Sequence, residues 1–191
     1  MPPKLIGLDY DGVVVDTVEQ RAWACIEIYG EDPPFRSFAA KTVVSEGRLT
    51  QQQYDDLMDI IFLDPQYAMV INPLPGAIEA IHSLIAAGLT PRIVTMRQAA
   101  SVKFVRRFLR SDDIRLGDLK VVATNRQRTK HEYVAGMLAF VDDRVEHLET
   151  MREIVPNLYL MDYYHVAEQA DWYTLVHDWD ELLPQLLQLA T

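Results

Sequence analysis

The sequence predicts an α/β protein: a doubly wound, mostly parallel (Rossmann-like) sheet with a small α-helical cap inserted after the first strand. Short apolar runs alternate with amphipathic stretches of helical length, which is the pattern of parallel strands joined by helices. The apolar runs lack strict alternation, as strands covered on both faces do. A helical block without a strand signal follows the first run. We therefore place the core at residues 1-16 and 73-191 and the cap at residues 17-72.

The first predicted strand, Leu5 to Leu8, ends in two acids, Asp9 and Asp11, before a glycine turn. Ligands of open α/β sheets bind at this carboxyl end of the strands. An Asp-Gly turn without chemistry is the simpler interpretation of the same residues. A calcium loop of EF-hand type is excluded, because it needs glycine at position six and glutamate at position twelve. Counted from Asp9, these positions hold Val14 and Gln20.

Composition narrows the classes of partner. The 191 residues are 49% hydrophobic and carry a formal net charge of −10, which argues against a nucleic-acid polymer and against an anionic membrane as partner. Cys25 is the single cysteine, so an intramolecular disulfide is excluded. The opening residues lack a signal-peptide pattern, and no apolar run is long enough for a transmembrane helix. These features predict a cytoplasmic protein, with a homodimer possible through the cap.

The predicted cap begins with a helix that ends near Gly30, and a second helix runs from Thr50 to about Phe62. Thr17 with Gln20, and Thr50 with Gln53, have the spacing of capping boxes. Asp16 is expected to cap the first helix or to orient it. Five cap side chains have the chemistry and length to reach a ligand, although core or solvent positions are the simpler fate of each: Trp23, Tyr29, Arg36, Lys41 and Tyr54.

The rest of the chain predicts further strand–helix units. Strands are expected at residues 91-95, 119-123, 137-141 and 158-161, with an edge strand at 174-176. A helix is expected between the opening segment 73-76 and Gly88, and further helices at 98-110, 144-154 and 180-189. Thr95 ends the second strand and forms a capping-box pattern with Gln98. Pro184 is expected near the first turn of the last helix.

Polar residues follow the predicted strands at the edge where their carboxyl ends meet: Asp9, Asp11, Thr95, Lys130, Asp142 and Asp143. Four carboxylates and a bound phosphate are too much negative charge for one lysine to offset, so the site needs a divalent cation. Oxygen ligands indicate Mg²⁺. The sequence has no Cys/His cluster of the kind that binds zinc.

This order of motifs resembles the haloacid dehalogenase-like (HAD) superfamily. The Asp-x-Asp-Gly-Val motif after an apolar strand is matched by Asp9 to Val13, and the second-motif hydroxyl by Thr95. Lys130 matches the third-motif lysine, and Asp142 with Asp143 match the acidic pair of the fourth motif. The resemblance covers nearly the whole chain, including a helical cap between the first two motifs.

The resemblance implies a Mg²⁺-dependent phosphatase. Asp9 would be the nucleophile that forms an aspartyl-phosphate, and Asp11 the general acid and then the base. Dehalogenases of the superfamily usually lack the second aspartate, so dehalogenation is disfavoured. Thr95 and Lys130 would bind the substrate phosphoryl group. The implied metal ligands are Asp9, Asp11 through its backbone carbonyl, Asp142 and Asp143.

Several of these assignments have alternatives. Arg126 and Arg128 compete with Lys130 for the third-motif role, and a solvated lysine at a helix start is the structural alternative. Thr95 is also a good helix N-cap. Asp143 could bind the metal, orient a metal-bound water or cap the helix that begins at Arg144.

The substrate is expected to be a small phosphorylated metabolite. The Asp142-Asp143-Arg144 ending and its short distance from Lys130 resemble the 5'(3')-deoxyribonucleotidase branch, which makes a nucleotide one candidate. The Pro75-Gly76-Ala77-Ile78 segment resembles the phosphoglycolate phosphatase branch, so phosphoglycolate or a sugar phosphate is the alternative. A phosphotransferase of the same superfamily, or a non-catalytic binding protein that keeps the fold, are the remaining readings of the sequence.

Overall fold

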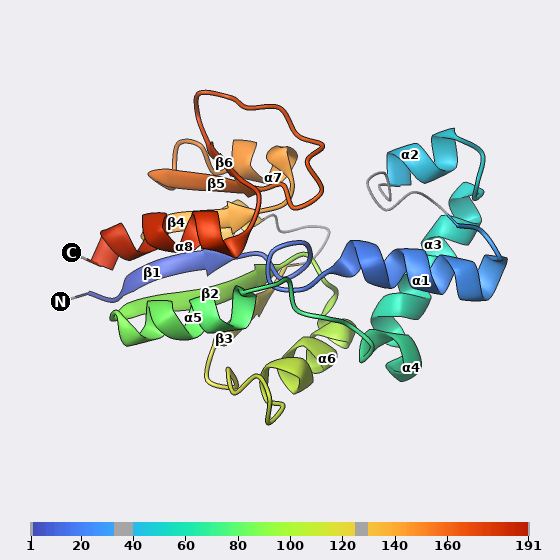
Figure 1. Ribbon diagram of the computed structural model, residues 1–191, viewed down its shortest axis with the longest axis horizontal. Helices are drawn as coiled ribbons and strands as arrows, with labels where there is room; N and C mark the ends of the chain where they lie inside the picture. Colours follow the sequence, from blue (N-terminus) through green and yellow to red (C-terminus); the bar gives the residue numbers. More distant parts are fainter. Residues whose placement is uncertain (1, 33–39, 125–129, 191) are drawn as a thin grey trace. The chain divides into compact units, whose positions relative to one another are not determined.

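The computed structural model describes residues 2–32, 40–124 and 130–190 (Figure 1). The chain divides into two compact units: Met1–Val15 with Pro73–Thr191 form unit 1, and Asp16–Asn72 form unit 2. The action of unit 2 as a cap stays a prediction. Arg36, Arg126, Arg128 and the side chain of Lys41 lie outside the described part of the chain, so their predicted roles are untested.

Unit 1 is built on a six-stranded sheet in the order β3-β2-β1-β4-β5-β6. Every neighbouring pair is parallel, which confirms the predicted fold class. The strands are β1 (Lys4–Leu8), β2 (Leu89–Thr95), β3 (Lys120–Ala123), β4 (Met137–Asp142), β5 (Asn157–Met161) and β6 (Thr174–Val176). The first strand therefore lies in the middle of the sheet, and the segments after β1, β2 and β4 leave from adjacent positions on one edge.

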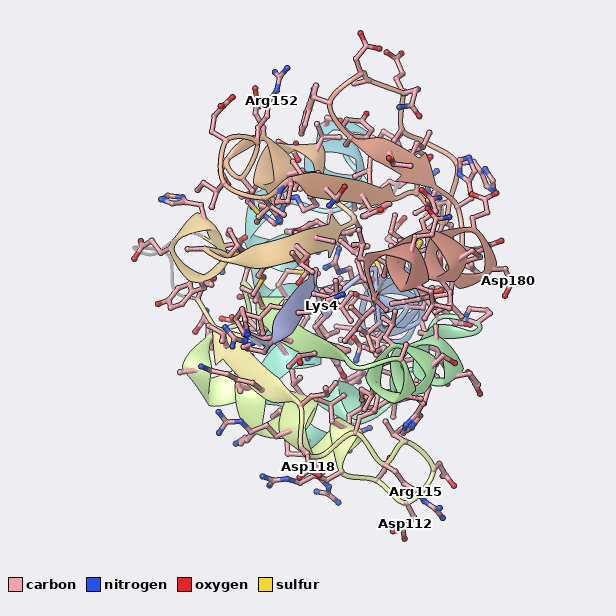
Figure 2. The ribbon with its side chains drawn as sticks, turned by 90° about the vertical axis from the view of Figure 1, so that its left-hand side faces the viewer. Lys4, Asp112, Arg115, Asp118, Arg152 and Asp180 are labelled. Atoms are coloured by element: carbon pink, nitrogen blue, oxygen red, sulfur yellow. The ribbon has the colours of Figure 1, made fainter. Side chains whose placement is uncertain are left out.

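Helices cover both faces of this sheet (Figure 2). The helices of unit 1 are α5 (Ala77–Ala86), α6 (Ala99–Leu109), α7 (Val145–Glu149) and α8 (Trp179–Leu187), with short 3-10 turns η2 (Lys130–Tyr133) and η3 (Gln188–Ala190). Helices α5 and α8 lie side by side over one face, whereas α6 and α7 cover the other. Burial on both faces is why the strands read as continuous apolar runs.

Most element boundaries lie within one or two residues of the predicted ones, and the largest difference is at the end of α7. Helix α7 ends at Glu149, and the expected helix to residue 154 continues instead as tight turns that bury Met151 and Val155. Strand β2 begins at Leu89, two residues before the predicted start, and Pro91 lies within it. Helix α8 begins at Trp179 with Asp178 as its N-cap, so Pro184 lies inside the helix and not near its first turn.

Gly7 is fixed by close packing at the centre of the sheet. It is paired in register with Phe140 of β4, and a Cβ at this position would overlap the Phe140 ring and the Met137 sulfur. We expect Gly7→Ala to lower the free energy of unfolding by about 1–3 kcal/mol, the usual cost of overpacking a core. Urea denaturation measures this, and an unchanged midpoint would contradict the packing described here.

The loop after β1 is anchored to the core. The backbone N–H of Asp9 donates to the carbonyl of Val141 at 2.9 Å, which extends the β1–β4 ladder by one residue. Val13, Val14 and Val15 are fully buried, and the Trp179 indole N–H donates to the Val13 carbonyl at 2.8 Å. The carboxylates carried by this loop are therefore held on a packed segment of chain.

Unit 2 has its own helices and its own core. Its helices are α1 (Thr17–Tyr29), α2 (Ala40–Ser45), α3 (Gln51–Leu63) and α4 (Pro65–Ala68). Their buried residues form one apolar cluster: Ala22, Ala24, Cys25, Val43, Leu49, Leu57 and Ile61. Helix α3 starts with the predicted capping box of Thr50 and Gln53. Helix α1 is capped by Asp16 and not by Thr17, because the Asp16 carboxylate accepts the Glu19 N–H at 2.9 Å.

Among the described residues, no helix combines the length and the apolar character that crossing a bilayer requires.

Candidate active site

Asp9 is a buried carboxylate at the carboxyl end of β1. It is 4% exposed, and its Oδ1 accepts the Tyr10 N–H at 2.7 Å. Its Oδ2 lies 2.6 Å from the ammonium of Lys130, which comes from η2 and is itself buried. An isolated buried carboxylate is costly, so the ion pair is what makes this position tolerable.

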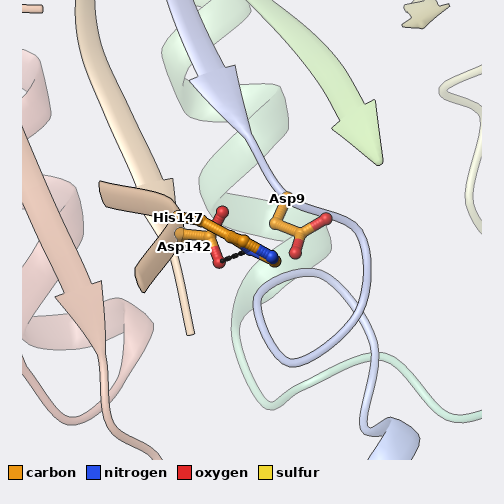
Figure 3. Close-up of side chains that lie close together, drawn as sticks. All are labelled: Asp9, Asp142 and His147. Carbon is orange, nitrogen blue, oxygen red and sulfur yellow. Dashed lines mark hydrogen bonds and ion pairs between the residues drawn. The ribbon is translucent and has the colours of Figure 1, made fainter. Parts of the chain in front are cut away.

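Lys130 links Asp9 to Asp142 at the end of the neighbouring strand β4. Its ammonium lies 2.7 Å from the Asp142 Oδ2, so one cation bridges two buried carboxylates. The other oxygen of Asp142 accepts the Arg144 N–H at 3.1 Å and the Nδ1 of His147 at 3.0 Å (Figure 3). His147 donates here, because an ionised carboxylate has only acceptors.

The three buried groups shift one another's protonation. Burial raises the pKa of Asp9 to about 7, and repulsion from Asp142 and Asp11 adds to this shift, although Lys130 opposes it. Burial alone would favour neutral Asp142, but Lys130 and His147 hold the pKa of Asp142 below its ordinary value. The two carboxylates outweigh burial and raise the pKa of Lys130. Without a bound metal, Asp142 is therefore the firmly ionised partner of Lys130, and Asp9 titrates near neutral pH.

Asp11 lies two residues further along the loop and is paired with Arg97. The guanidinium Nη2 lies 2.8 Å from Asp11 Oδ1 and Nε lies 3.0 Å from Oδ2, which is a bidentate contact. The backbone N–H of Arg97 donates to the Thr95 hydroxyl oxygen at 3.1 Å. Thr95 is fully buried at the end of β2, so the loops after β1 and β2 are joined through Arg97.

Asp143 approaches the same loop from β4. Gly12 has a φ of +75°, and a Cβ at this position would collide with the Asp143 carboxylate. A glycine is therefore required both by the backbone conformation and by the space that Asp143 fills. Asp143 is exposed, unlike Asp142. Neither predicted helix cap is present: α7 and α6 have Arg144 and Gln98 as N-caps, so Asp143 and Thr95 do not cap them.

The described cap residues have local roles within unit 2. The Tyr29 hydroxyl donates to the Gln53 carbonyl at 3.2 Å, and Tyr54 packs on the apolar cluster of that unit. Trp23 is 41% exposed, and its ring lies 5.5 Å from that of Tyr67. Trp23 lines a hollow of about 240 Å³ between the start of α1 and the end of the unit. The core interpretation thus holds for Tyr54, and contact of Trp23 with a ligand stays a prediction.

Comparison with solved structures identifies the fold. A protein of Clostridium acetobutylicum described as a predicted phosphatase superposes with a TM-score of 0.66 at 12% identity, over 97% of this chain and 99% of that one. A Lactobacillus plantarum protein, provisionally assigned as a phosphoglycolate phosphatase, gives 0.65 at 15% identity, over 97% and 100%. A HAD-superfamily hydrolase of subfamily IA, variant 1, from Geobacter sulfurreducens PCA gives 0.61 at 15% identity, over 96% of both chains.

This chain has the HAD-superfamily fold. Neither a family model nor a curated protein sequence matches it, so the likeness lies in the structure and in the few motif residues quoted above. At such low identity the comparisons establish the HAD fold, and the activity has to be argued from the site.

The six predicted residues lie at or just after the carboxyl ends of β1, β2 and β4 or, for Lys130, at the start of η2. Lys130 contacts Asp9 and Asp142 directly, and Asp11 is joined to Thr95 through Arg97. Two residues of the site were not predicted: Arg97 and His147. Arg97 stands two positions after Thr95, and His147 stands one helical turn after Asp143. Both could have been found by asking which side chains with N–H groups follow the second and fourth motifs.

The residues present fit Mg²⁺. Donor atoms of Asp9, Asp142 and His147 lie within 4.8 Å of one another, and carboxylate oxygens are the donors that Mg²⁺ prefers. Four carboxylates with two cationic side chains, Lys130 and Arg97, leave an excess of negative charge that a bound divalent cation would offset. Asp11 and Asp143 stand outside this cluster, so their part in metal binding stays a prediction.

Proposed function

We propose that this protein is a Mg²⁺-dependent phosphatase that hydrolyses a small phosphomonoester through an aspartyl-phosphate on Asp9. The observation that carries the proposal is the buried Asp9–Lys130–Asp142 triad at the carboxyl edge of the sheet. A structural ion pair needs only one carboxylate, and replacing it with apolar residues costs little. A buried lysine shared by two carboxylates, beside two further acids, is instead the arrangement of a site that handles negative charge.

In the first half-reaction, an oxygen of Asp9 attacks phosphorus, and the bond from phosphorus to the leaving oxygen breaks. Asp11 donates its proton to that oxygen. In the second half-reaction, water attacks phosphorus, the bond to Asp9 breaks, and the water proton passes to Asp11. Inorganic phosphate is released, and Asp11 holds a proton for the next turnover.

The neighbouring residues supply orientation and charge. Lys130 fixes the Asp9 carboxylate and offsets negative charge in the transition state. The Thr95 hydroxyl oxygen accepts from Arg97 and keeps its own hydrogen to donate to a phosphoryl oxygen. Asp9 and Asp142 would hold Mg²⁺, which supplies charge stabilisation and aligns the phosphoryl group.

The substrate proposal is a small phosphorylated metabolite. A nucleotide is one candidate, and phosphoglycolate or a sugar phosphate is the alternative, favoured by the provisional assignment of the Lactobacillus plantarum structure. Transfer of the phosphoryl group to an acceptor other than water uses the same first half-reaction. A non-catalytic binding role is disfavoured, because each acid and the second-motif hydroxyl are present and connected.

The test is phosphate release from p-nitrophenyl phosphate and from a panel of nucleotides, sugar phosphates and phosphoglycolate, with Mg²⁺ and with EDTA. We expect Mg²⁺-dependent turnover that falls on the order of 10⁴-fold in Asp9→Asn, because the nucleophile is removed. Asp118→Asn, which changes an exposed aspartate away from the site, is the matched control. Turnover that survives in Asp9→Asn would refute the aspartyl-phosphate route, and Mg²⁺ binding without any turnover would favour the binding role.

A further inference from the structure

The contact between Arg97 and Asp11 has a geometry that a general acid does not require. Arg97 is 4% exposed, and two of its nitrogens face the two oxygens of one carboxylate. A bidentate contact fixes the plane of a carboxylate as well as its position, which a lysine cannot do. The orientation of Asp11 is thus set by Arg97, two positions after the second-motif threonine.

Arg97 is itself held from three sides. Its guanidinium carbon lies 4.9 Å from the centre of the Tyr10 ring, and this ring packs edge-on against Phe108 of α6. Its backbone N–H is fixed on the Thr95 hydroxyl. Burial would weaken its charge, but Asp11 outweighs burial and raises the pKa of Arg97, so the guanidinium stays protonated. The guanidinium of Arg97 is therefore held in one position and stays charged beside Asp11.

A buried ion pair is a poor source of stability, because desolvation cancels most of the attraction. This pair includes Asp11, which in the proposed reaction gives a proton to the leaving-group oxygen and later takes one from water. Resting on the phosphatase function above, we propose that Arg97 is a positioning residue for Asp11: its fork holds the carboxylate in the orientation that meets the leaving-group oxygen and then the attacking water. Arg97 acts through Asp11, so it is needed only where proton transfer limits the rate.

Substrates with different leaving groups distinguish a positioning role of Arg97 from a role as phosphate ligand or structural residue. Benzyl phosphate releases an alkoxide that needs a proton, whereas p-nitrophenyl phosphate, of similar size, releases a stabilised phenolate. The ratio kcat/KM reports the steps through loss of the leaving group. In Arg97→Gln we expect kcat/KM to fall about 10²-fold for benzyl phosphate, the size of a general-acid effect, and only a few-fold for p-nitrophenyl phosphate. Arg97→Lys, which keeps the charge without the fork, should lose less on benzyl phosphate and remain folded.

A double-mutant cycle tests whether Arg97 acts through Asp11. In an Asp11→Asn background, Arg97→Gln should change kcat/KM for benzyl phosphate less than twofold, because the group that it positions is already absent. Arg106→Gln, at an exposed arginine of α6, is the matched control and should leave both substrates unchanged. Thermal unfolding of each variant, measured in parallel, shows whether the fold is kept.

The outcomes are distinguishable. An equal fall for both substrates, or an additive loss in the Asp11→Asn background, would overturn the positioning role and make Arg97 a phosphate ligand or a structural residue. Unchanged kinetics in both Arg97 variants would overturn it as well. A wild-type protein that binds Mg²⁺ but turns over neither substrate would overturn the phosphatase function first, and the role of Arg97 with it.

Discussion

Replacing Lys130 by methionine is expected to lower the free energy of unfolding by about 3–5 kcal/mol, the cost of removing one partner from a buried ion pair. The change leaves Asp9 and Asp142 facing each other, with 4% and 0% of their surface exposed and no ammonium between them. Methionine fills a similar volume, so lost charge and not a cavity dominates the effect. Urea unfolding at neutral pH, in EDTA, measures it.

The same variant is expected to lose about 10²–10³-fold in phosphatase kcat, the usual cost of removing one group that stabilises transition-state charge. Lys120→Met is the matched control, because Lys120 is exposed at the start of β3. The loss of unfolding free energy in Lys130→Met should be smaller at acidic pH, because protonation of Asp9 or Asp142 relieves the repulsion between them. A variant as stable and as active as the wild type would show that Lys130 is a dispensable partner, and the third-motif role would pass to another basic residue.

The sheet could be predicted because a strand that is buried on both faces appears in the sequence as a continuous apolar run. Met137 to Val141 could be recognised as a strand from its composition alone, and the acids after it followed from its end. Helix starts were less predictable. Thr50 and Gln53 form their capping box, but at the start of α1 the competing carboxylate of Asp16 takes the amide. Asp16 and Thr17 could each cap this first turn, so the sequence alone does not decide between them.

The contacts within the site could not be read from sequence spacing. Asp9 and Asp142 could be placed at one sheet edge, because parallel strands end together. The position of Lys130 between these two carboxylates could not be predicted, because η2 is a four-residue 3-10 turn and has no helical or strand periodicity in the sequence. The pairing of Arg97 with Asp11 spans 86 positions and depends on a side chain turning back over Tyr10. The sequence places His147 one helical turn after Asp143, but it does not show that the imidazole contacts Asp142.

Asp9→Asn is expected to stabilise the metal-free protein at pH 8 and not at pH 4. Burial raises the pKa of Asp9 from 3.8 to about 7, so the folded state keeps this proton at a pH where the unfolded chain has lost it. Between these two values the folded state binds more protons, so the stability of the wild type falls as pH rises. Above pH 7 the destabilisation by the buried Asp9 carboxylate is fully present. Asparagine carries no charge, so the Asp9→Asn variant lacks this contribution to the pH dependence of stability.

The size of the difference follows from the same shift. At about 1.4 kcal/mol per pKa unit, Asp9→Asn should exceed the wild type in unfolding free energy by about 2–4 kcal/mol at pH 8, and by close to zero at pH 4. Urea unfolding in EDTA across this range measures it, with Asp118→Asn as the exposed control. A gap of the same size at both ends of the range would mean that Asp9 keeps an ordinary pKa.

Adding Mg²⁺ should reverse the order at pH 8. A cation that binds the folded state alone stabilises it by mass action, and the wild type offers the Asp9 carboxylate that the variant lacks. The midpoint of thermal unfolding should therefore rise with Mg²⁺ in the wild type and much less in Asp9→Asn. Equal shifts in both proteins would place the ion away from Asp9. The reason is that the negative charge which destabilises the folded protein without a cation is the same charge that would bind Mg²⁺.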